Sequence, residues 1–191
     1  MNASEIAAAF AVAVLIGVVA SIVVASYNAV VALRQRSDKA WSNIDVVLKQ
    51  RHDQLPNLVG AVRGVMSYER DVLIRVTDAR AAYSPTAPIP DQAATSEATS
   101  AAVKTLFAVV ERYPDVKSAA NVQDLQDEIE RIEGMIAARR ELYNDQVYRY
   151  NTRIHQVPGV LMAPVFGWHE REFFAAEPGD AERPDTGLDR T

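Results

Sequence analysis

The chain has 191 residues, a formal net charge of −5 and no cysteine. Its length suits one soluble domain with appended segments, and without cysteine it forms no disulfide, thiolate metal site or cysteine nucleophile. The mild negative charge lacks the basic signature of a nucleic-acid-binding protein, so we expect no nucleic-acid partner. Hydrophobic residues make up 49% of the chain, and many of them lie within residues 1–33.

Residues 6–33 contain no charged side chain. About 20 apolar residues cross the hydrocarbon core of a bilayer, so this run can span a membrane and continue past the headgroups. A cleaved signal peptide would have a basic start and a shorter apolar stretch, whereas Met1 to Glu5 has no basic residue. We therefore predict a transmembrane anchor over residues 1–33.

Basic residues follow the predicted span and none precedes it. They are Arg34, Arg36, Lys39, Lys49 and Arg51. Because basic residues favour the cytoplasmic side, we expect a single-pass protein of the bacterial plasma (inner) membrane, with its N-terminus outside and its C-terminal domain in the cytoplasm.

Small residues recur at every fourth position of the predicted span. This small-residue ridge consists of Ala9, Ala13, Gly17, Ser21, Ala25 and Ala29. Such a ridge lets two helix backbones approach closely, although an alanine-rich segment can also produce it by chance. Self-association through the ridge and coincidence both remain open.

Apolar residues keep a helical spacing after the span. The stripe comprises Trp41, Ile44, Leu48, Leu55, Leu58, Val62, Met66, Leu73, Val76, Ala79 and Tyr83. It keeps its phase across Pro56, so we expect a kinked but continuous helix there rather than a reversal. Three prolines between residues 85 and 90 then break the pattern.

Two further helical regions follow. One is expected from Asp91 to Arg112, and Pro114 suits the first position of a new helix. Apolar residues with near-heptad spacing, typical of coiled-coil packing, run from Val122 to Val157 and end at Pro158-Gly159. The fold expected is all-α: an N-terminal transmembrane helix followed by an antiparallel bundle of three to four long helices.

The bundle domain is expected over residues 34–175. Within it, residues 160–174 are apolar and aromatic but too short for a second span, and they could pack on the bundle, the membrane face or a partner. Residues 176–191 are acidic and rich in Pro, Gly and Asp, which predicts a disordered tail.

Two polar clusters are candidate structural or binding sites. Tyr143-Asn144 and Tyr150-Asn151 lie one heptad apart and share a helix face. They could line a polar binding groove. Alternatively, the tyrosines fill the core while the asparagines satisfy each other or a facing helix, and we favour this structural alternative.

The second cluster combines Arg51, His52 and Asp53 with Asn57. It could handle protons or bind an anion. We favour an interhelix clamp beside Pro56, where freed carbonyls need donors, with Arg51 reaching Glu133 or Glu141.

The sequence contains no recognisable catalytic motif. His52, His155 and His169 lack the spacing of a metal-binding helix, and no hydrolase elbow or phosphate-binding glycine loop occurs. We therefore expect no catalytic residue, cofactor or metal, and no enzymatic activity.

Several motifs together resemble the LemA family. They are Tyr27-Asn28; Ala40-Trp41-Ser42-Asn43-Ile44-Asp45-Val46; Arg51-His52-Asp53-Gln54-Leu55-Pro56-Asn57-Leu58-Val59; Ala79-Arg80; Arg112-Tyr113-Pro114-Asp115; Glu133 through Ala138-Arg139; Tyr143-Asn144; Tyr150-Asn151; and Phe166-Gly167. The resemblance covers roughly residues 20 to 175 and implies a membrane-anchored, largely cytoplasmic helical bundle without established enzymatic activity. A related protein serves in building magnetosome membranes, so the resemblance also suggests a role in membrane organisation.

These features predict a noncatalytic membrane-anchored scaffold or adaptor. Its expected partners are the lipid bilayer, further copies of itself through the transmembrane helix and bundle, and other membrane proteins. The alternative is a membrane-tethered sensor that binds a small ligand or peptide, which a cavity lined by Tyr143, Asn144 and Tyr150 would support. An enzyme with an unrecognised site is a third hypothesis, and retained function after substitution of Arg51, His52 and Asp53 would exclude its best candidate.

Overall fold

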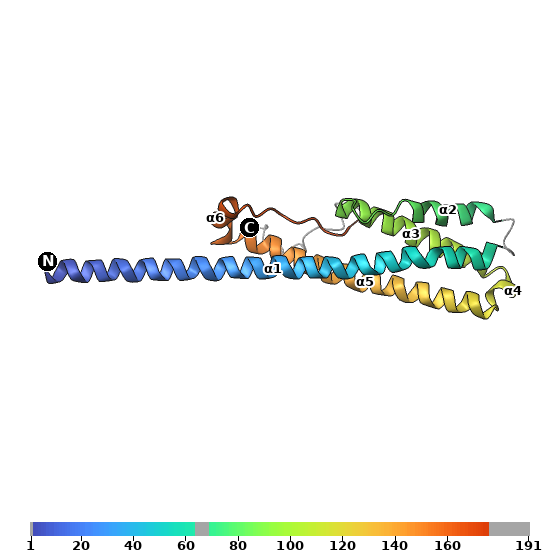
Figure 1. Cartoon of the computed structure of the whole chain (residues 1–191), viewed down its shortest axis with the longest axis horizontal. Helices are drawn as coiled ribbons and strands as arrows, with labels where there is room; N and C mark the ends of the chain where they lie inside the picture. Colours follow the sequence, from blue (N-terminus) through green and yellow to red (C-terminus); the bar gives the residue numbers. More distant parts are fainter. Residues whose placement is uncertain (1, 64–68, 176–191) are drawn as a thin grey trace, which may run out of the picture. The chain divides into compact units, whose positions relative to one another are not determined.

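The computed structural model describes residues 2–63 and 69–175. All regular elements in these ranges are α-helices, as Figure 1 shows. They are α1 (Ala3–Arg63), α2 (Arg70–Ala81), α3 (Ile89–Val110), α4 (Pro114–Lys117), α5 (Ala120–His155) and α6 (Gly159–Phe166). The all-α class is therefore confirmed.

The chain divides into two compact units. Of the described residues, the membrane unit comprises 2–39 and 145–171, and the bundle unit comprises 40–63, 69–144 and 172–175. Helices α1 and α5 each contribute to both units. This division follows packing and does not decide the predicted boundary at residue 33.

Helix α1 is one continuous helix. At its start, the Glu5 carboxylate accepts a hydrogen bond from the backbone N–H of Asn2 at 2.9 Å. Pro56 lies inside the helix, which continues through it to Arg63. The expected continuity at Pro56 is thus confirmed.

The stripe that begins at Trp41 is divided between two helices. Helix α1 ends at Arg63 and α2 begins at Arg70, whereas the periodicity predicted a break only at the prolines between residues 85 and 90. The periodicity missed this division because the stripe resumes in phase after it. The predicted stripe residue Met66 lies outside the described residues.

The later boundaries agree more closely with expectation. Helix α3 begins two residues before the predicted Asp91, and α4 begins at Pro114, which occupies a first-turn position. The long α5 ends at His155, just before Pro158. Proline marks these positions because its fixed φ suits the first turn of a helix and its missing N–H hinders continuation.

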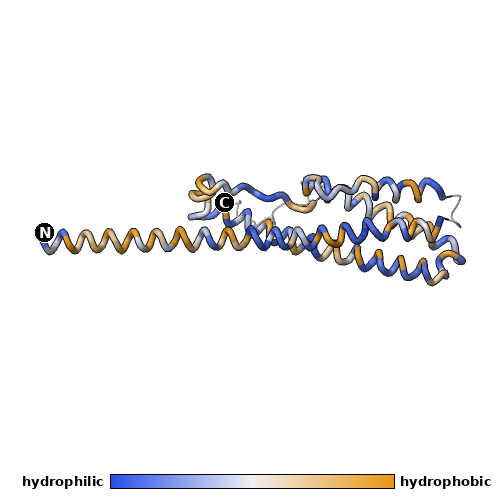
Figure 2. The backbone as a smooth tube through the Cα atoms, in the orientation of Figure 1, coloured by the Kyte–Doolittle hydropathy of each residue, from blue (hydrophilic) through white to orange (hydrophobic). Residues whose placement is uncertain are grey.

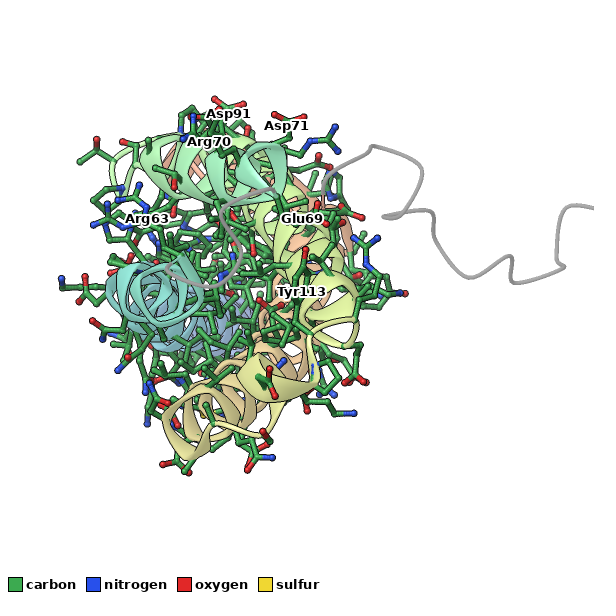
Figure 3. All side chains as sticks on the ribbon, turned by 90° about the vertical axis from the view of Figure 1, so that its right-hand side faces the viewer. Arg63, Glu69, Arg70, Asp71, Asp91 and Tyr113 are labelled. Carbon is green, nitrogen blue, oxygen red and sulfur yellow. The ribbon has the colours of Figure 1, made fainter. Side chains whose placement is uncertain are left out.

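The bundle unit has one hydrophobic core to which α1, α2, α3, α4 and α5 all contribute. Its buried members are Leu55, Leu58, Val62, Leu73, Val76, Val103, Leu106, Val109, Val110, Val116, Val122 and Ile129. In this unit the four long helices alternate in direction, and seen end-on they surround the core (Figures 1 and 3). Each fully buried aliphatic side chain contributes about 1.5–3 kcal/mol, which stabilises the antiparallel bundle.

Side chains at one end of the bundle unit connect α2 to the chain after α3, and Figure 3 labels two of them, Glu69 and Tyr113. The Tyr113 hydroxyl, just before α4, donates to the carboxylate of Glu69, just before α2, over 3.4 Å. Arg112 also pairs with Glu69 at 3.1 Å. These contacts join the start of α2 to the connection that follows α3.

The membrane unit contains the apolar first half of α1, which Figure 2 shows in orange. Among the described residues, α1 is the one helix long and apolar enough to cross a membrane, and its most apolar stretch is unburied. This helix suggests membrane anchoring. Farther along, Val30, Tyr150, Ile154, Met162 and Trp168 form a small buried cluster.

The apolar segment expected over residues 160–174 packs back on helices of its own chain. Met162 and Trp168 join the membrane unit's cluster. In the bundle unit, Phe174 is buried with its ring 5.8 Å from that of Trp41. The predicted tail, residues 176–191, lies outside the described residues.

Candidate functional site

Arg51 projects from α1 into the bundle unit, where its side chain is only 4% exposed. One terminal nitrogen donates to Glu133 Oε1 at 2.8 Å and to Ser100 Oγ at 2.9 Å. The other donates to Ser96 Oγ at 2.8 Å and to the Ser96 carbonyl at 3.2 Å. These four bonds match the four N–H groups of the terminal nitrogens, so both of these nitrogens are satisfied by α3 and α5.

The partners of Arg51 are bonded to one another as well. Ser100 Oγ lies 2.6 Å from Glu133 Oε2 and donates its proton there, while accepting from Arg51. Of the two carboxylates expected to pair with Arg51, the structure brings Glu133 to it. The arrangement is an interhelix clamp in which a buried charge has both an ionic partner and hydrogen bonds.

The other members of the predicted Arg51 cluster have different partners. Asp53 pairs with Lys49 at 3.2 Å on the exposed face of α1. Asn57 is also exposed and donates to Gln54 at 3.0 Å. Asp53 and Asn57 therefore lie apart from the contacts that Arg51 makes.

Pro56 leaves one carbonyl of α1 without its helical donor, and Arg80 supplies a hydrogen bond to it. A proline lacks the N–H that would bond the carbonyl four residues earlier, which here belongs to His52. Arg80 Nε, from α2, donates to that carbonyl at 3.1 Å. The clamp expected beside Pro56 thus exists, but its donor is Arg80, which the sequence analysis named only within the Ala79-Arg80 motif and gave no role.

The His52 side chain packs against Tyr83. Their ring centroids are 5.1 Å apart, and the Tyr83 hydroxyl donates to Asp45 Oδ1 over 3.4 Å. Burial, reinforced by the negative charge of Asp45, raises the pKa of Tyr83 to about 12. Burial and then the charge of Arg80 lower the pKa of His52, and Nδ1 of His52 is buried without a partner among the described protein atoms.

A cavity of about 10 Å³ adjoins His52 and is bordered by Arg51, Tyr83, Thr95 and Thr99. This volume is near the minimum for one water molecule. The arrangement can keep a neutral imidazole beside a neutral phenol, and it is too small for an organic ligand.

Each asparagine of the two Tyr-Asn motifs binds the backbone of the segment after α6. In the bundle unit, Asn144 accepts from the Phe174 N–H at 2.9 Å and donates to the Phe174 carbonyl at 3.3 Å. In the membrane unit, Asn151 accepts from the Arg171 N–H at 2.9 Å and donates to the Arg171 carbonyl at 3.0 Å. Each side-chain amide therefore pairs with both polar groups of one residue.

The spacing of these partners explains why the motif repeats. Seven residues of α5 rise about 10.5 Å, and three residues of extended chain cover about 10 Å. Asn144 and Asn151 are seven residues apart, and Phe174 and Arg171 are three apart. The expected polar face is thus occupied by the chain's own backbone, rather than by a facing helix or by asparagine–asparagine pairs.

The tyrosines of these motifs are buried. The Tyr143 hydroxyl donates to the Glu172 carbonyl at 2.9 Å, and its ring lies 5.5 Å from that of Trp41. In the membrane unit, the Arg171 guanidinium lies 5.7 Å from the centre of the Tyr150 ring and pairs with Asp38 at 2.6 Å. Tyr143 and Tyr150 therefore fill core positions and also hold the segment that contains Arg171 and Glu172.

The small-residue ridge lies on the lipid-compatible part of α1. Ala9, Ala13, Gly17, Ser21 and Ala25 are exposed, and Ala29 is half-buried. The Ser21 hydroxyl donates to the Gly17 carbonyl at 2.8 Å. Its polarity is thereby satisfied inside the helix, which suits an apolar environment.

Within residues 2–63 and 69–175, no three His, Asp or Glu side chains are grouped to hold a metal ion. Two larger grooves occur in the bundle unit. One of about 220 Å³ lies beside Pro56 between α1 and α2. The other, of about 210 Å³, is bordered by Glu133, Arg140 and Phe174.

Comparison with known proteins gives a family and distant relatives. The LemA family matches residues 40–187. Magnetosome protein MamQ 2 and magnetosome protein MamQ 1 of Paramagnetospirillum magneticum (strain AMB-1) are each 34% identical over 73 residues, which are 38% of this chain and 27% of theirs. Magnetosome protein MamQ of Magnetospirillum gryphiswaldense (strain MSR-1) is 33% identical over 73 residues, with the same coverage. The chain thus matches only about a quarter of the length of these relatives.

Proposed function

This chain belongs to the LemA family, and we propose that it is a noncatalytic membrane-anchored scaffold or adaptor that self-associates or organises a membrane complex. One observation carries the proposal: its distinctive polar side chains bind the chain's own groups. Arg51, Asn144 and Asn151 hold helices and backbone of the same copy. The exposed apolar part of α1 offers a broad surface for partners.

The proposed location is the bacterial plasma (inner) membrane, with the N-terminus outside and the bundle unit in the cytoplasm. Arg34, Arg36 and Lys39 follow the apolar stretch, and the residues before it include no basic side chain. The positive-inside rule supports this orientation. The three relatives are magnetosome proteins by name, and this similarity supports the proposed role in organising a membrane complex.

The proposed surface for self-association is the small-residue ridge. An added Cβ at Gly17 meets no atom within 4 Å, and Ala13 is exposed. Leucine at both positions would therefore preserve the fold of one copy while holding two spans apart. We expect Ala13→Leu combined with Gly17→Leu to lower the association constant at least about tenfold, measured by energy transfer between labelled copies in liposomes.

The matched control is Ala8→Leu combined with Ala11→Leu. It places two leucines on the opposite side of α1. Equal association constants for the two double variants would remove the ridge from the proposal. A chain that stays monomeric at all densities, and that crosslinks to no membrane protein in its native membrane, would contradict the scaffold itself.

A second candidate function is a membrane-tethered sensor, and the groove beside Pro56 favours it. Its volume of about 220 Å³ is bordered by Val59, Gly60, Arg63, Val76 and Arg80 among others. Drug-sized ligands occupy about 300–1,000 Å³, so this groove suits a small ligand or one peptide side chain.

Filling the groove tests the sensor. An added Cβ at Gly60 meets no atom within 4 Å, so Gly60→Leu occupies the groove without a backbone clash. Native mass spectrometry of the chain purified from its membrane should show a bound small molecule that Gly60→Leu loses. If neither form contains a bound molecule, the sensor candidate is removed.

A further inference from the structure

The exposed part of α1 has the length of a membrane core. Every described side chain of α1 before Ser26 is exposed, and Ser26 is the first buried one. At 1.5 Å per residue, the uncharged stretch from Ile6 to Ala25 extends about 30 Å, the thickness of the hydrocarbon core. If this stretch crosses the bilayer, the boundary between lipid chains and headgroups lies at Ser26 and Tyr27.

Helix α6 packs against α1 at that level. The Tyr27 ring lies 5.0 Å from the Phe166 ring and 5.9 Å from the Trp168 ring. Phe166 and Trp168 are stacked at 5.2 Å. Tyr and Trp are enriched at the boundary between lipid chains and headgroups, where an apolar ring can keep its polar atom in water.

The outward face of α6 is apolar. Leu161 and Val165, four residues apart on α6, are 70% and 77% exposed, and Val157, just before the helix, is 75% exposed. Val160 and Phe166 add further exposed apolar surface. No residue of Gly159–Phe166 is charged. Soluble surfaces seldom gather so many exposed apolar side chains unless they bind a partner or a membrane.

Exposed basic side chains lie about two to two and a half helical turns along α1 from Tyr27. Arg34 and Arg36 are exposed, and both belong to the membrane unit with α6. Basic residues beside an apolar helix suit the anionic headgroups of a cytoplasmic leaflet. If α1 crosses a bilayer as far as Ser26, the aromatic rings and the uncharged face of α6 therefore lie at the surface of that same bilayer.

We propose that α6 is a second membrane contact: it lies in the interface of the bilayer that α1 crosses and inserts Val157, Leu161 and Val165 among the lipid chains. The proposal rests on the anchoring of α1 and goes beyond the scaffold role, because it assigns a lipid-binding surface to a segment too short to span. It also fixes how deeply the first half of α1 sits in the membrane.

Spin labels on single cysteines test the proposal in the full chain, which has no natural cysteine. The variants Leu161→Cys and Val165→Cys are labelled and reconstituted in vesicles of zwitterionic and anionic phospholipid. Collision with oxygen, which concentrates in lipid, is compared with collision with a water-soluble nickel chelate. We expect the ratio of oxygen to nickel collisions to be at least about fivefold higher than at Ile74→Cys, an aqueous control on α2 that is 54% exposed.

A label at Ala13→Cys reports on the span and keeps the two ideas separate. If Ala13 is deep in lipid while Leu161 and Val165 resemble Ile74, α6 does not enter the membrane and the anchor stands. If the Ala13 label is in water, the anchor itself fails. If Leu161 is shielded from both reagents, a second copy or another protein covers α6, and the lipid proposal is overturned.

Discussion

At the scale of single residues, Arg51 shows how a buried charge is used in this fold. Its guanidinium reaches the side chains of two other helices, and Glu133 supplies the opposite charge while keeping 28% of its side chain exposed. Removing one partner of such a pair leaves the other desolvated and uncompensated. Arg51 therefore orients α1, α3 and α5 as well as stabilising them.

We expect Arg51→Ala to lower the free energy of unfolding by about 3 kcal/mol, the lower end for breaking a buried pair, because water can still reach Glu133. Urea unfolding of the full chain in detergent, followed by circular dichroism, measures the change. Lys49→Ala is the control, because its pair with Asp53 is exposed and screened by solvent. A loss from Arg51→Ala no larger than that of the control would contradict the clamp.

His52 should make stability depend on pH. Burial, followed by the charge of Arg80, lowers its pKa in the folded chain below the ordinary value of 6.5. As the pH falls through 6.5, the unfolded chain takes up a proton that the folded chain resists. The free energy of unfolding therefore rises with pH across the window between the folded pKa and 6.5, and falls as the solution is acidified through it.

Replacing the imidazole tests this dependence. His52→Phe keeps a ring against Tyr83 and removes the buried, unpartnered Nδ1. We expect the difference in unfolding free energy between pH 7.5 and pH 5 to be smaller for His52→Phe than for the unmodified chain, because carboxylates contribute equally to both. Identical pH profiles would show that His52 titrates alike in the folded and unfolded chains.

At the scale of elements, the paired asparagines hold an extended segment against a helix. Asn144 and Asn151 accept from the N–H groups of Phe174 and Arg171, so removing either acceptor should expose one particular amide to exchange. We expect Asn151→Ala to speed hydrogen exchange at Arg171, and Asn144→Ala at Phe174, by about tenfold, which corresponds to about 1.4 kcal/mol for a lost hydrogen bond.

Aspartate at the same positions is the matched control. Asn144→Asp and Asn151→Asp keep an oxygen that can accept from the N–H groups but lose the N–H that binds the carbonyls. Protection of the Arg171 and Phe174 amides should therefore survive in the aspartate variants. Equal exchange in the alanine and aspartate variants would show that packing, rather than the asparagine oxygen, protects these amides.

Features that depend on residues close together in the sequence were predictable, whereas most contacts between distant residues were not. Helices and their proline-marked ends depend on local spacing, so α3, α5 and the helix start at Pro114 were predicted closely, whereas the short separate helix α4 was not. The Arg51–Glu133 pair was foreseeable because a charge on an apolar stripe needs a partner. The division between α1 and α2 was missed because the apolar stripe keeps its helical phase across it. The partners of Asn144 and Asn151 were missed because no local pattern specifies where residues 171–174 pack against α5.

Arg80 is an instructive omission. Its signal was present: Pro56 leaves the His52 carbonyl without its helical donor, and a long basic side chain on a neighbouring helix can supply one. Which basic residue does so depends on the packing of α2 against α1. The same applies to Tyr83, whose contact with His52 arises only when α1 and α2 lie side by side.

At the scale of the whole molecule, the first part of α1 contributes nothing to the core of a single copy. Every described side chain from Ser4 to Ala25 is exposed, whereas the buried apolar side chains of α1 begin at Val30. A chain that starts at Ser26 would therefore keep the buried clusters of both units. We expect its free energy of unfolding to match that of the full chain within about 0.5 kcal/mol, since surface changes have small effects.

The same truncated chain separates two routes of self-association. If copies associate through the span, the chain that starts at Ser26 should be monomeric by sedimentation equilibrium at concentrations where the full chain in detergent associates. If the bundle itself forms the contact, association should persist without the span. Because the ridge lies almost wholly before Ser26, a truncated chain that is monomeric yet fully folded would assign assembly to the span and leave the bundle free for other membrane proteins.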